Sequence, residues 1–353
     1  MKTISTILLF VLPFLCSGQD AGVPIYGFRH YQMLYKGDSV DILVKSKAGQ
    51  ENTKKPLFFF CQGSLPIPLM IKYKKGDQDE IANVFPFINL ENILDGYHLA
   101  IVGKPAVPLI ADEQFLNEDM AVSNNNINFL KKYTERNVLS YYTARNINVI
   151  NFLKTLPFVS SEAIVLAGHS EGSTIAAKMA TIDSDITALI YSGGNPLGRI
   201  MTAASRSRAP NSQLYNQQDS IFANWKRITR KSSKQTNEID PDKTTLEFSI
   251  PAPIEYLKKL TIPVLVTFGS KDYGLLSAED YLRIELIRLG KNNFTFKEYQ
   301  DMEHNFFAVK PSGEIDYDKY NWDKVADDWL NWLKKFHTPI RYSRNIARQV
   351  QGR

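Results

Sequence analysis

The chain has 353 residues, of which 44% are hydrophobic and 22% are charged, and its formal net charge is +5. This length allows one large domain or two modest ones, and the composition excludes disorder across the whole chain. Basic residues gather at 206–234 and 341–353, but neither a motif of interleaved basic and aromatic residues nor a nucleic-acid-binding fold signature is present, so we predict no nucleic-acid partner. We interpret these stretches as solvated surface, with attraction of an anionic acyl substrate or a membrane surface by 206–234 as the less favoured alternative.

The first 18 residues have the pattern of a secretory signal peptide. A positive charge at Lys2 precedes an apolar core at 4–15, which is too short to span a bilayer, and small residues lead to a cleavage site after Gly18. We therefore predict a secreted or periplasmic protein. Lipidation at Cys16 is the less favoured alternative, because the leucine before it is bulky. No later stretch suits a membrane span, and cleavage leaves Cys61 as the single cysteine, without a partner for an intramolecular disulfide.

The order of apolar segments predicts a mostly parallel sheet with helices on both faces. Residues 27–47 alternate apolar and polar side chains around a turn, as two antiparallel strands do. Continuous apolar runs, typical of strands buried on both faces, follow. These runs are at 55–64, 97–107, 162–170, 186–195, 262–272 and 294–305. Helical spacing is found between them, at 78–95, 120–156, 172–182, 277–290 and 320–336. Buried strands that alternate with helices specify an α/β fold.

One long segment interrupts this alternation. Between the runs at 186–195 and 262–272 the chain is basic and polar at first, then apolar only in short pieces. We interpret residues 197–258 as an inserted cap over the strand ends. The apolar spacing at 214–228 favours an ordered cap over a disordered loop. The predicted organisation is one domain at 19–340, followed by a basic tail at 341–353.

The sequence "IVLAGHSEGSTIAAK" at 164–178 contains the motif G-x-S-x-G, from Gly168 to Gly172. It joins a buried strand to an alanine-rich helix, and the two glycines let strand and helix approach without a collision of Cβ atoms. We therefore predict that the turn presents the Ser170 hydroxyl to a substrate. The alternative is that Ser170 only caps the helix, since serine is a preferred capping residue.

A serine hydroxyl becomes a good nucleophile only beside a base that an acid orients. In a parallel sheet these groups lie at the carboxyl ends of the strands. Asp272 follows the apolar run that starts at residue 262, and His304 follows the next one. No other acid stands directly at a late strand end. Of the five histidines, His304 alone has the required order and position, since His169 lies within the turn and is expected to point away.

These motifs resemble the α/β-hydrolase superfamily over nearly the whole mature chain. They are G-x-S-x-G between strand and helix, "GSKD" after a late strand and "EHNF" before the final helix. The resemblance is to the capped esterase, lipase and serine-peptidase branch. It implies an acyl-transfer hydrolase with Ser170 as nucleophile, His304 as general base and acid, and Asp272 as the orienting carboxylate.

The same resemblance implies an oxyanion hole made of two backbone N–H groups. One is that of Glu171, at the start of the helix. The other follows the strand at 55–64, where the family usually has His-Gly and this chain has Gln62-Gly63. The matching donor is the amide of Ser64, with Leu65 as an alternative one residue along.

The function predicted from these residues is a secreted serine hydrolase that cleaves a carboxylic ester of a small-molecule or peptide acyl substrate. The alternatives are a serine peptidase, aminopeptidase or amidase on the same triad, in which the Glu171 carboxylate holds a substrate amine, or a binding protein without catalysis. The sequence has no H-E-x-x-H, C-x-x-C or glycine-rich phosphate loop, so we predict no metal and no cofactor.

Overall fold

A computed structural model describes most of the chain between residues 22 and 336. The described residues are 22–76, 78–122, 127–209, 212–230, 240 and 242–336. The predicted signal peptide and the basic tail lie outside them, as do parts of the predicted cap. Of the helices in the described ranges, none combines the length and apolar character needed to cross a bilayer.

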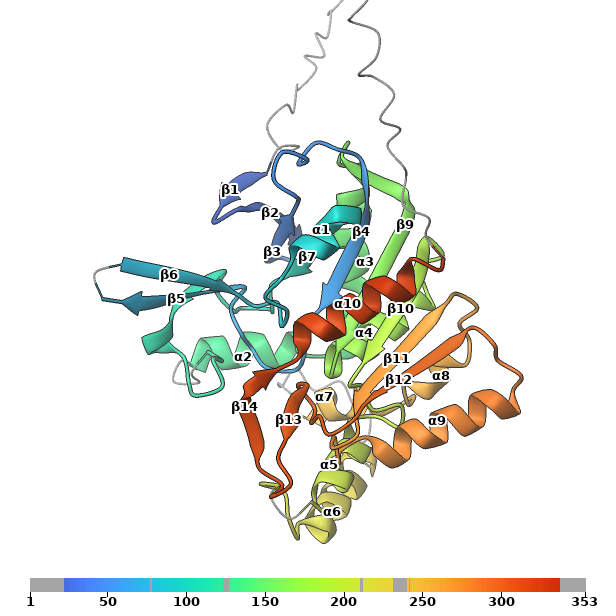
Figure 1. The fold of residues 1–353 in the computed structure, drawn as a ribbon. Helices are drawn as coiled ribbons and strands as arrows, with labels where there is room; N and C mark the ends of the chain where they lie inside the picture. The colour runs from blue at the N-terminus through green and yellow to red at the C-terminus, as the bar shows by residue number, and fades with distance from the viewer. Residues whose placement is uncertain are drawn as a thin grey trace, which may run out of the picture.

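A sheet of nine strands forms the centre of the protein (Figure 1). Its strands, in spatial order, are β1 (Val23–Ile25), β2 (Phe28–Tyr35), β3 (Asp38–Lys45), β7 (His98–Val102), β4 (Lys55–Cys61), β9 (Val159–His169), β10 (Ile186–Ser192), β11 (Val264–Gly269) and β12 (Phe294–Tyr299). The six strands from β7 to β12 are parallel, and the first three are antiparallel at one edge. The predicted hairpin, the predicted strands and the α/β fold class are confirmed.

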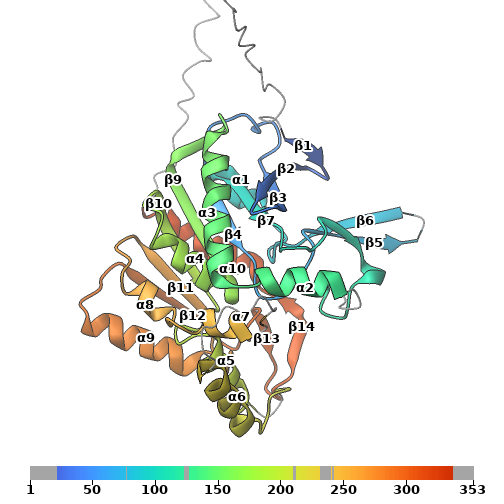
Figure 2. The same cartoon turned by 180° about the vertical axis from the view of Figure 1, so that it is seen from behind.

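Helices cover both faces of this sheet (Figures 1 and 2). The helices are α1 (Glu91–Gly96), α2 (Ile127–Arg136), α3 (Leu139–Thr155), α4 (Glu171–Ala180), α5 (Arg199–Arg206), α6 (Gln218–Arg230), α7 (Asp242–Glu247), α8 (Ile254–Leu257), α9 (Leu276–Arg288) and α10 (Trp322–Leu333), with a 3-10 turn at Glu113–Phe115. The apolar sides of α3, α4, α8 and α9 share one hydrophobic core, and those of α1 and α10 share the other. The central strands are therefore buried on both faces, which explains their continuous apolar sequence.

The helix predicted at 78–95 is wrong for most of its length. Residues Gln78–Asn83 form β6, which pairs antiparallel with β5 (Met70–Lys75), and β8 (Ile110–Asp112) completes a separate three-stranded sheet. Figure 1 shows β5 and β6 extending away from the main sheet. Pro86 follows this strand, and a proline within a helix removes a hydrogen bond and clashes with the preceding turn. Only the end of the predicted segment, α1, is helical.

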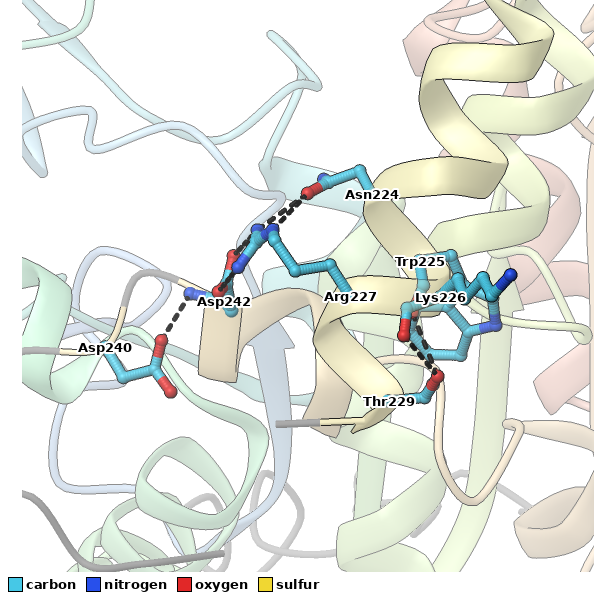
Figure 3. A network of polar contacts seen from close by, with 7 residues as sticks. All are labelled: Asn224, Trp225, Lys226, Arg227, Thr229, Asp240 and Asp242. Carbon is cyan, nitrogen blue, oxygen red and sulfur yellow. Dashed lines mark hydrogen bonds and ion pairs between the residues drawn. The ribbon is translucent and has the colours of Figure 1, made fainter. Parts of the chain in front are cut away.

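The segment between β10 and β11 contains α5, α6, α7 and α8, and α5 and α6 lie beyond the lower end of the sheet in Figure 1. An ion pair links two of these helices (Figure 3). The Arg227 guanidinium of α6 donates to both carboxylate oxygens of Asp242, the first residue of α7, at 2.5 and 2.7 Å, and also to Asn224. A forked contact of this kind fixes orientation as well as distance. That the segment acts as a cap stays a prediction.

Candidate active site

The turn between β9 and α4 holds Ser170 in a conformation that side chains rarely adopt, with φ 56° and ψ −125°. Two glycines make the turn possible. A Cβ on Gly168 would lie 2.2 Å from the carbonyl oxygen of Gly172, and a Cβ on Gly172 would lie 2.1 Å from that of Cys61. Since glycine has no Cβ, it is the residue that fits at both positions, and the backbone can therefore bend sharply at Ser170. The side chain of Ser170 makes no capping hydrogen bond to α4, which argues against the alternative of a helix cap.

We expect Gly172→Ala to destabilise the protein by about 1–3 kcal/mol or more, because the added methyl group would push β4 away from α4. Urea unfolding followed by circular dichroism measures the difference. The matched control is Gly96→Ala at the end of α1, where an added Cβ meets nothing within 4 Å. We expect that control to change stability by less than about 0.5 kcal/mol. Equal unfolding midpoints for the two variants would contradict the close approach.

Asp272 and His304 lie in contact after the ends of β11 and β12. His304 Nδ1 donates a hydrogen bond to Asp272 Oδ2 at 2.5 Å, and the Asp272 carboxylate is buried. Gly269 allows this contact, since a Cβ there would lie 2.2 Å from the carbonyl oxygen of Met302. The loop after β12 therefore passes closely over the end of β11. Because Nδ1 carries the proton, the other ring nitrogen, Nε2, is left as an acceptor.

Neighbouring side chains hold the His304 loop and ring. The Glu303 carboxylate accepts the backbone N–H groups of Asn305 at 2.7 Å and Phe307 at 3.1 Å, which closes the loop on itself. The ring of His169 packs beside that of His304 with 4.9 Å between centroids, a contact that the sequence did not indicate. Burial, reinforced by the nearby His304, lowers the pKa of His169 well below its usual value. His169 therefore stays neutral and serves as packing.

A cavity of about 230 Å³ opens over Ser170 and His304. It is lined by residues from the strand ends and from the segment between β10 and β11. These are Ser64, Ser170, Glu171, Thr174, Gly193, Asn195, Gly198, Arg199, Thr202, Ala203, Arg206, Leu214, Phe248, Leu275 and His304. Among the described residues, Ser170 and His304 share this cavity without a hydrogen bond between them. Such catalytic contacts are often long in unliganded enzymes and shorten when substrate binds.

The predicted oxyanion residues Glu171 and Ser64 line the same cavity as Ser170. Glu171 is the first residue of α4, so its N–H has no acceptor within the helix. The loop that carries Ser64 is anchored on two sides, because Tyr133 donates to its carbonyl oxygen at 3.0 Å and Gln62 donates to the carbonyl oxygen of Val102 at 2.8 Å. Leu65 is 43% exposed and does not line the cavity, which favours Ser64.

One oxygen of the Glu171 carboxylate is already paired with a cation. Its Oε2 accepts from Arg199 at 2.5 Å, and the side chain is only 7% exposed. Burial lowers the pKa of the nearby Lys104 to about 8, while the charge of Glu171 acts in the opposite direction. The other oxygen of this carboxylate, Oε1, is buried and has no hydrogen-bond partner among the described residues, so a substrate amine could reach it only by entering this buried space.

A second carboxyl group, Glu279 of α9, lies buried near Asp272. It is 1% exposed, and neither of its oxygens has a hydrogen-bond partner among the described residues. Burial raises its pKa well above the usual value, and the charges of Asp272 and Asp280 raise it further. Glu279 is therefore a neutral acid at moderate pH. This role could not be predicted from the sequence, because Glu279 lies in a helix after the strand end.

We expect Glu279→Gln to stabilise the protein at neutral pH. An acid whose pKa is raised by folding binds its proton more tightly in the folded state, so stability falls as pH rises above about 4.5, the ordinary value. Glutamine does not ionise, so the stability of the variant does not fall for this reason as pH rises. A gain of about 1 kcal/mol raises Tm by roughly 2–4 °C at pH 8. Thermal melts at pH 4 should show no gain, and an equal shift at both pH values would contradict the assignment.

The structure thus brings together Ser170, Asp272, His304, Glu171 and Ser64 at one edge of the sheet. Cys61 is buried next to them, and desolvation raises the pKa of its thiol to about 12, so it is a core residue. Among the described residues, no group of three or more His, Cys, Asp or Glu side chains is arranged to hold a metal ion.

Residues 139–305 match the family described as "BAAT / Acyl-CoA thioester hydrolase C terminal". The match begins with α3, ends one residue after His304 and contains Ser170 and Asp272, although it covers less than half of the chain. No curated protein matches the chain.

Three solved structures illustrate the similarity of the fold. An acylaminoacyl peptidase from Pyrococcus horikoshii is 16% identical with a TM-score of 0.54, over 87% of this chain and 41% of that one. Est1E from Butyrivibrio proteoclasticus is 13% identical with a TM-score of 0.51, over 87% and 98%. Acetyl xylan esterase 1 from Thermoanaerobacterium sp. is 12% identical with a TM-score of 0.51, over 89% and 86%. This chain therefore spans less than half of the length of the peptidase. At these identities, the three comparisons show a similar fold and nothing more.

Proposed function

We propose that the chain is a serine hydrolase of the α/β-hydrolase superfamily, which cleaves a carboxylic ester through an acyl-enzyme on Ser170; the similarity of its fold to solved hydrolases and the partial family match support this proposal. The observation that carries this proposal is the hydrogen bond from His304 Nδ1 to Asp272 at 2.5 Å, on the rim of the cavity that contains Ser170. This bond fixes the tautomer in which Nε2 can accept a proton.

In the proposed reaction, His304 Nε2 takes the Ser170 proton while the serine oxygen bonds to the substrate carbonyl carbon. The carbonyl oxygen becomes an oxyanion, which the N–H groups of Glu171 and Ser64 stabilise. Collapse of this intermediate breaks the ester bond, and the leaving alcohol takes the proton from His304. Water then attacks the acyl-enzyme, gives its proton to His304 and releases the acid, and the proton returns to Ser170.

A thioester is the second candidate substrate, because the family match that contains Ser170, Asp272 and His304 is described as an acyl-CoA thioester hydrolase. The same attack on the carbonyl carbon would release a thiol instead of an alcohol. An aminopeptidase that holds a substrate amine on Glu171 is less favoured, since Arg199 already pairs with Oε2 of that carboxylate and Oε1 is buried. The pattern of residues 1–18 supports the further proposal that the enzyme acts outside the cytoplasm.

A fluorophosphonate probe tests the nucleophile directly. We expect one covalent adduct on the wild-type protein, located on Ser170 by peptide mass spectrometry, and none on Ser170→Ala. Hydrolysis of p-nitrophenyl acyl esters, acyl thioesters and aminoacyl p-nitroanilides then ranks the substrate classes. A folded wild-type protein that takes no label and hydrolyses none of these substrates would overturn the proposal in favour of a binding protein.

A further inference from the structure

The cavity over Ser170 contains a guanidinium group that has no partner in the part of the chain that the structure describes. Arg206, the last residue of α5, lines the cavity and makes no ion pair or side-chain hydrogen bond with any residue in the described ranges. The other arginine of the cavity, Arg199, is paired with Glu171. Apart from His304, the charged side chains that line the cavity are therefore the ion pair of Glu171 and Arg199, and Arg206, which has no ion-pair partner among the described residues.

The surroundings of Arg206 leave its hydrogen-bond donors without a partner among the described residues. A Cβ added to Gly274 would lie 3.2 Å from Arg206 Nε and 3.3 Å from Asp272 Oδ1, so the glycine leaves room for the guanidinium close to the candidate triad. The Asp272 carboxylate is engaged elsewhere. Its Oδ2 accepts from His304 and its Oδ1 accepts from the N–H of Gly274 at 3.3 Å. Arg206 therefore keeps its donors for another acceptor.

We propose that Arg206 binds a carboxylate of the substrate, so that the enzyme prefers an acyl substrate that carries one negative charge. This inference rests on the proposed hydrolase function and names its substrate class. A guanidinium matches a carboxylate with two parallel hydrogen bonds. A single guanidinium balances one negative charge, whereas a phosphate near neutral pH carries up to two.

The rest of the cavity fits a short substrate of this kind. Its volume of about 230 Å³ is below the usual 300–1,000 Å³ of ligand pockets. Leu214, Phe248 and Leu275 provide apolar lining that would contact a carbon chain between the ester and the carboxylate. A small acyl group with an apolar middle and an anionic end matches the small volume, the apolar lining and the guanidinium of this cavity.

The kinetic test compares mono-4-nitrophenyl adipate with 4-nitrophenyl hexanoate, two esters of equal acyl length of which only the first carries a carboxylate. We expect the wild-type ratio of kcat/KM, adipate over hexanoate, to fall roughly 10- to 100-fold in Arg206→Gln, as for loss of a hydrogen bond to a charged group. Arg206→Lys should recover part of the ratio. The ratio should also fall as salt is added, because the cavity is open to solvent.

The matched control is Arg208→Gln, which removes the same charge two residues away. Arg208 is exposed, donates to the carbonyl oxygen of Ala204 and does not line the cavity. We expect this variant to keep the wild-type ratio. If Arg206→Gln lowers turnover of both esters equally, Arg206 supports the Asp272 charge instead and the proposal is overturned. An unchanged ratio would overturn it as well.

Binding to Ser170→Ala separates this inference from the proposed function. Calorimetry should show that monomethyl adipate binds about 10-fold or more tightly than methyl hexanoate, and that Arg206→Gln removes the difference. If this difference in binding is observed but the wild-type protein hydrolyses neither ester, the carboxylate-binding site is supported and the proposed hydrolase function is rejected. Equal binding of the two esters would reject the site. Inorganic phosphate and acetate can also be compared as competitors of monomethyl adipate binding. If phosphate competes more strongly than acetate and this difference requires Arg206, the site prefers a phosphate to a carboxylate, and the assignment is overturned.

Discussion

Ser170→Ala is expected to lower kcat for the best ester by about 10⁴- to 10⁶-fold without loss of the fold. The variant lacks the oxygen that forms the acyl-enzyme, and the remaining oxyanion donors give only a small part of the rate. Stopped-flow release of p-nitrophenol measures both the burst and the steady state. The burst should disappear together with turnover.

The stability of Ser170→Ala separates chemistry from structure. The serine side chain makes no capping hydrogen bond, and alanine at this position has the same backbone strain, so we expect an unfolding free energy within about 0.5 kcal/mol of wild type. A variant that unfolds more easily by 1–2 kcal/mol and keeps its turnover would instead assign Ser170 a role in starting α4.

The parts of the site that could be predicted from the sequence are those fixed by the parallel sheet. Strands buried on both faces produce continuous apolar runs, and the residues just after them must lie at one edge. This rule predicts the positions of Asp272 and His304, and their contact at 2.5 Å follows from the adjacent positions of β11 and β12. The role of Ser170 could be predicted from the two glycines around it taken together with the acid and the histidine after later strands.

The parts that could not be predicted depend on side-chain direction and on competition between local patterns. Residues 78–83 have helical spacing, but pairing with β5 and the proline that follows favour a strand. Glu279 and Arg206 lie on helices, and nothing in their sequence neighbourhood shows which face meets the cavity or the buried space beside Asp272. The contact between His169 and His304 likewise depends on packing around Phe306 and Trp322.

Asp272→Asn is expected to lower kcat by about 10⁴-fold at neutral pH while substrate binding changes little. An asparagine can offer its N–H₂ group to His304 Nδ1, which favours the wrong tautomer, and it cannot stabilise the imidazolium formed during attack. Steady-state kinetics with the best ester measures the loss. The matched control is Asp301→Asn on the neighbouring loop, where an exposed carboxylate pairs with Lys271, and we expect turnover within about twofold of wild type.

Glu279 is a second carboxyl group near the site, so the loss expected for Asp272→Asn depends on Glu279 not taking the place of Asp272. Burial is the largest cause of its raised pKa, and that cause stays when the Asp272 charge is removed. Glu279 therefore remains protonated in the variant and cannot supply the missing negative charge. Adding Glu279→Gln to Asp272→Asn should leave kcat unchanged. A double variant much slower than Asp272→Asn alone would show that Glu279 takes over as the orienting carboxylate, and it would contradict its assignment as a neutral acid.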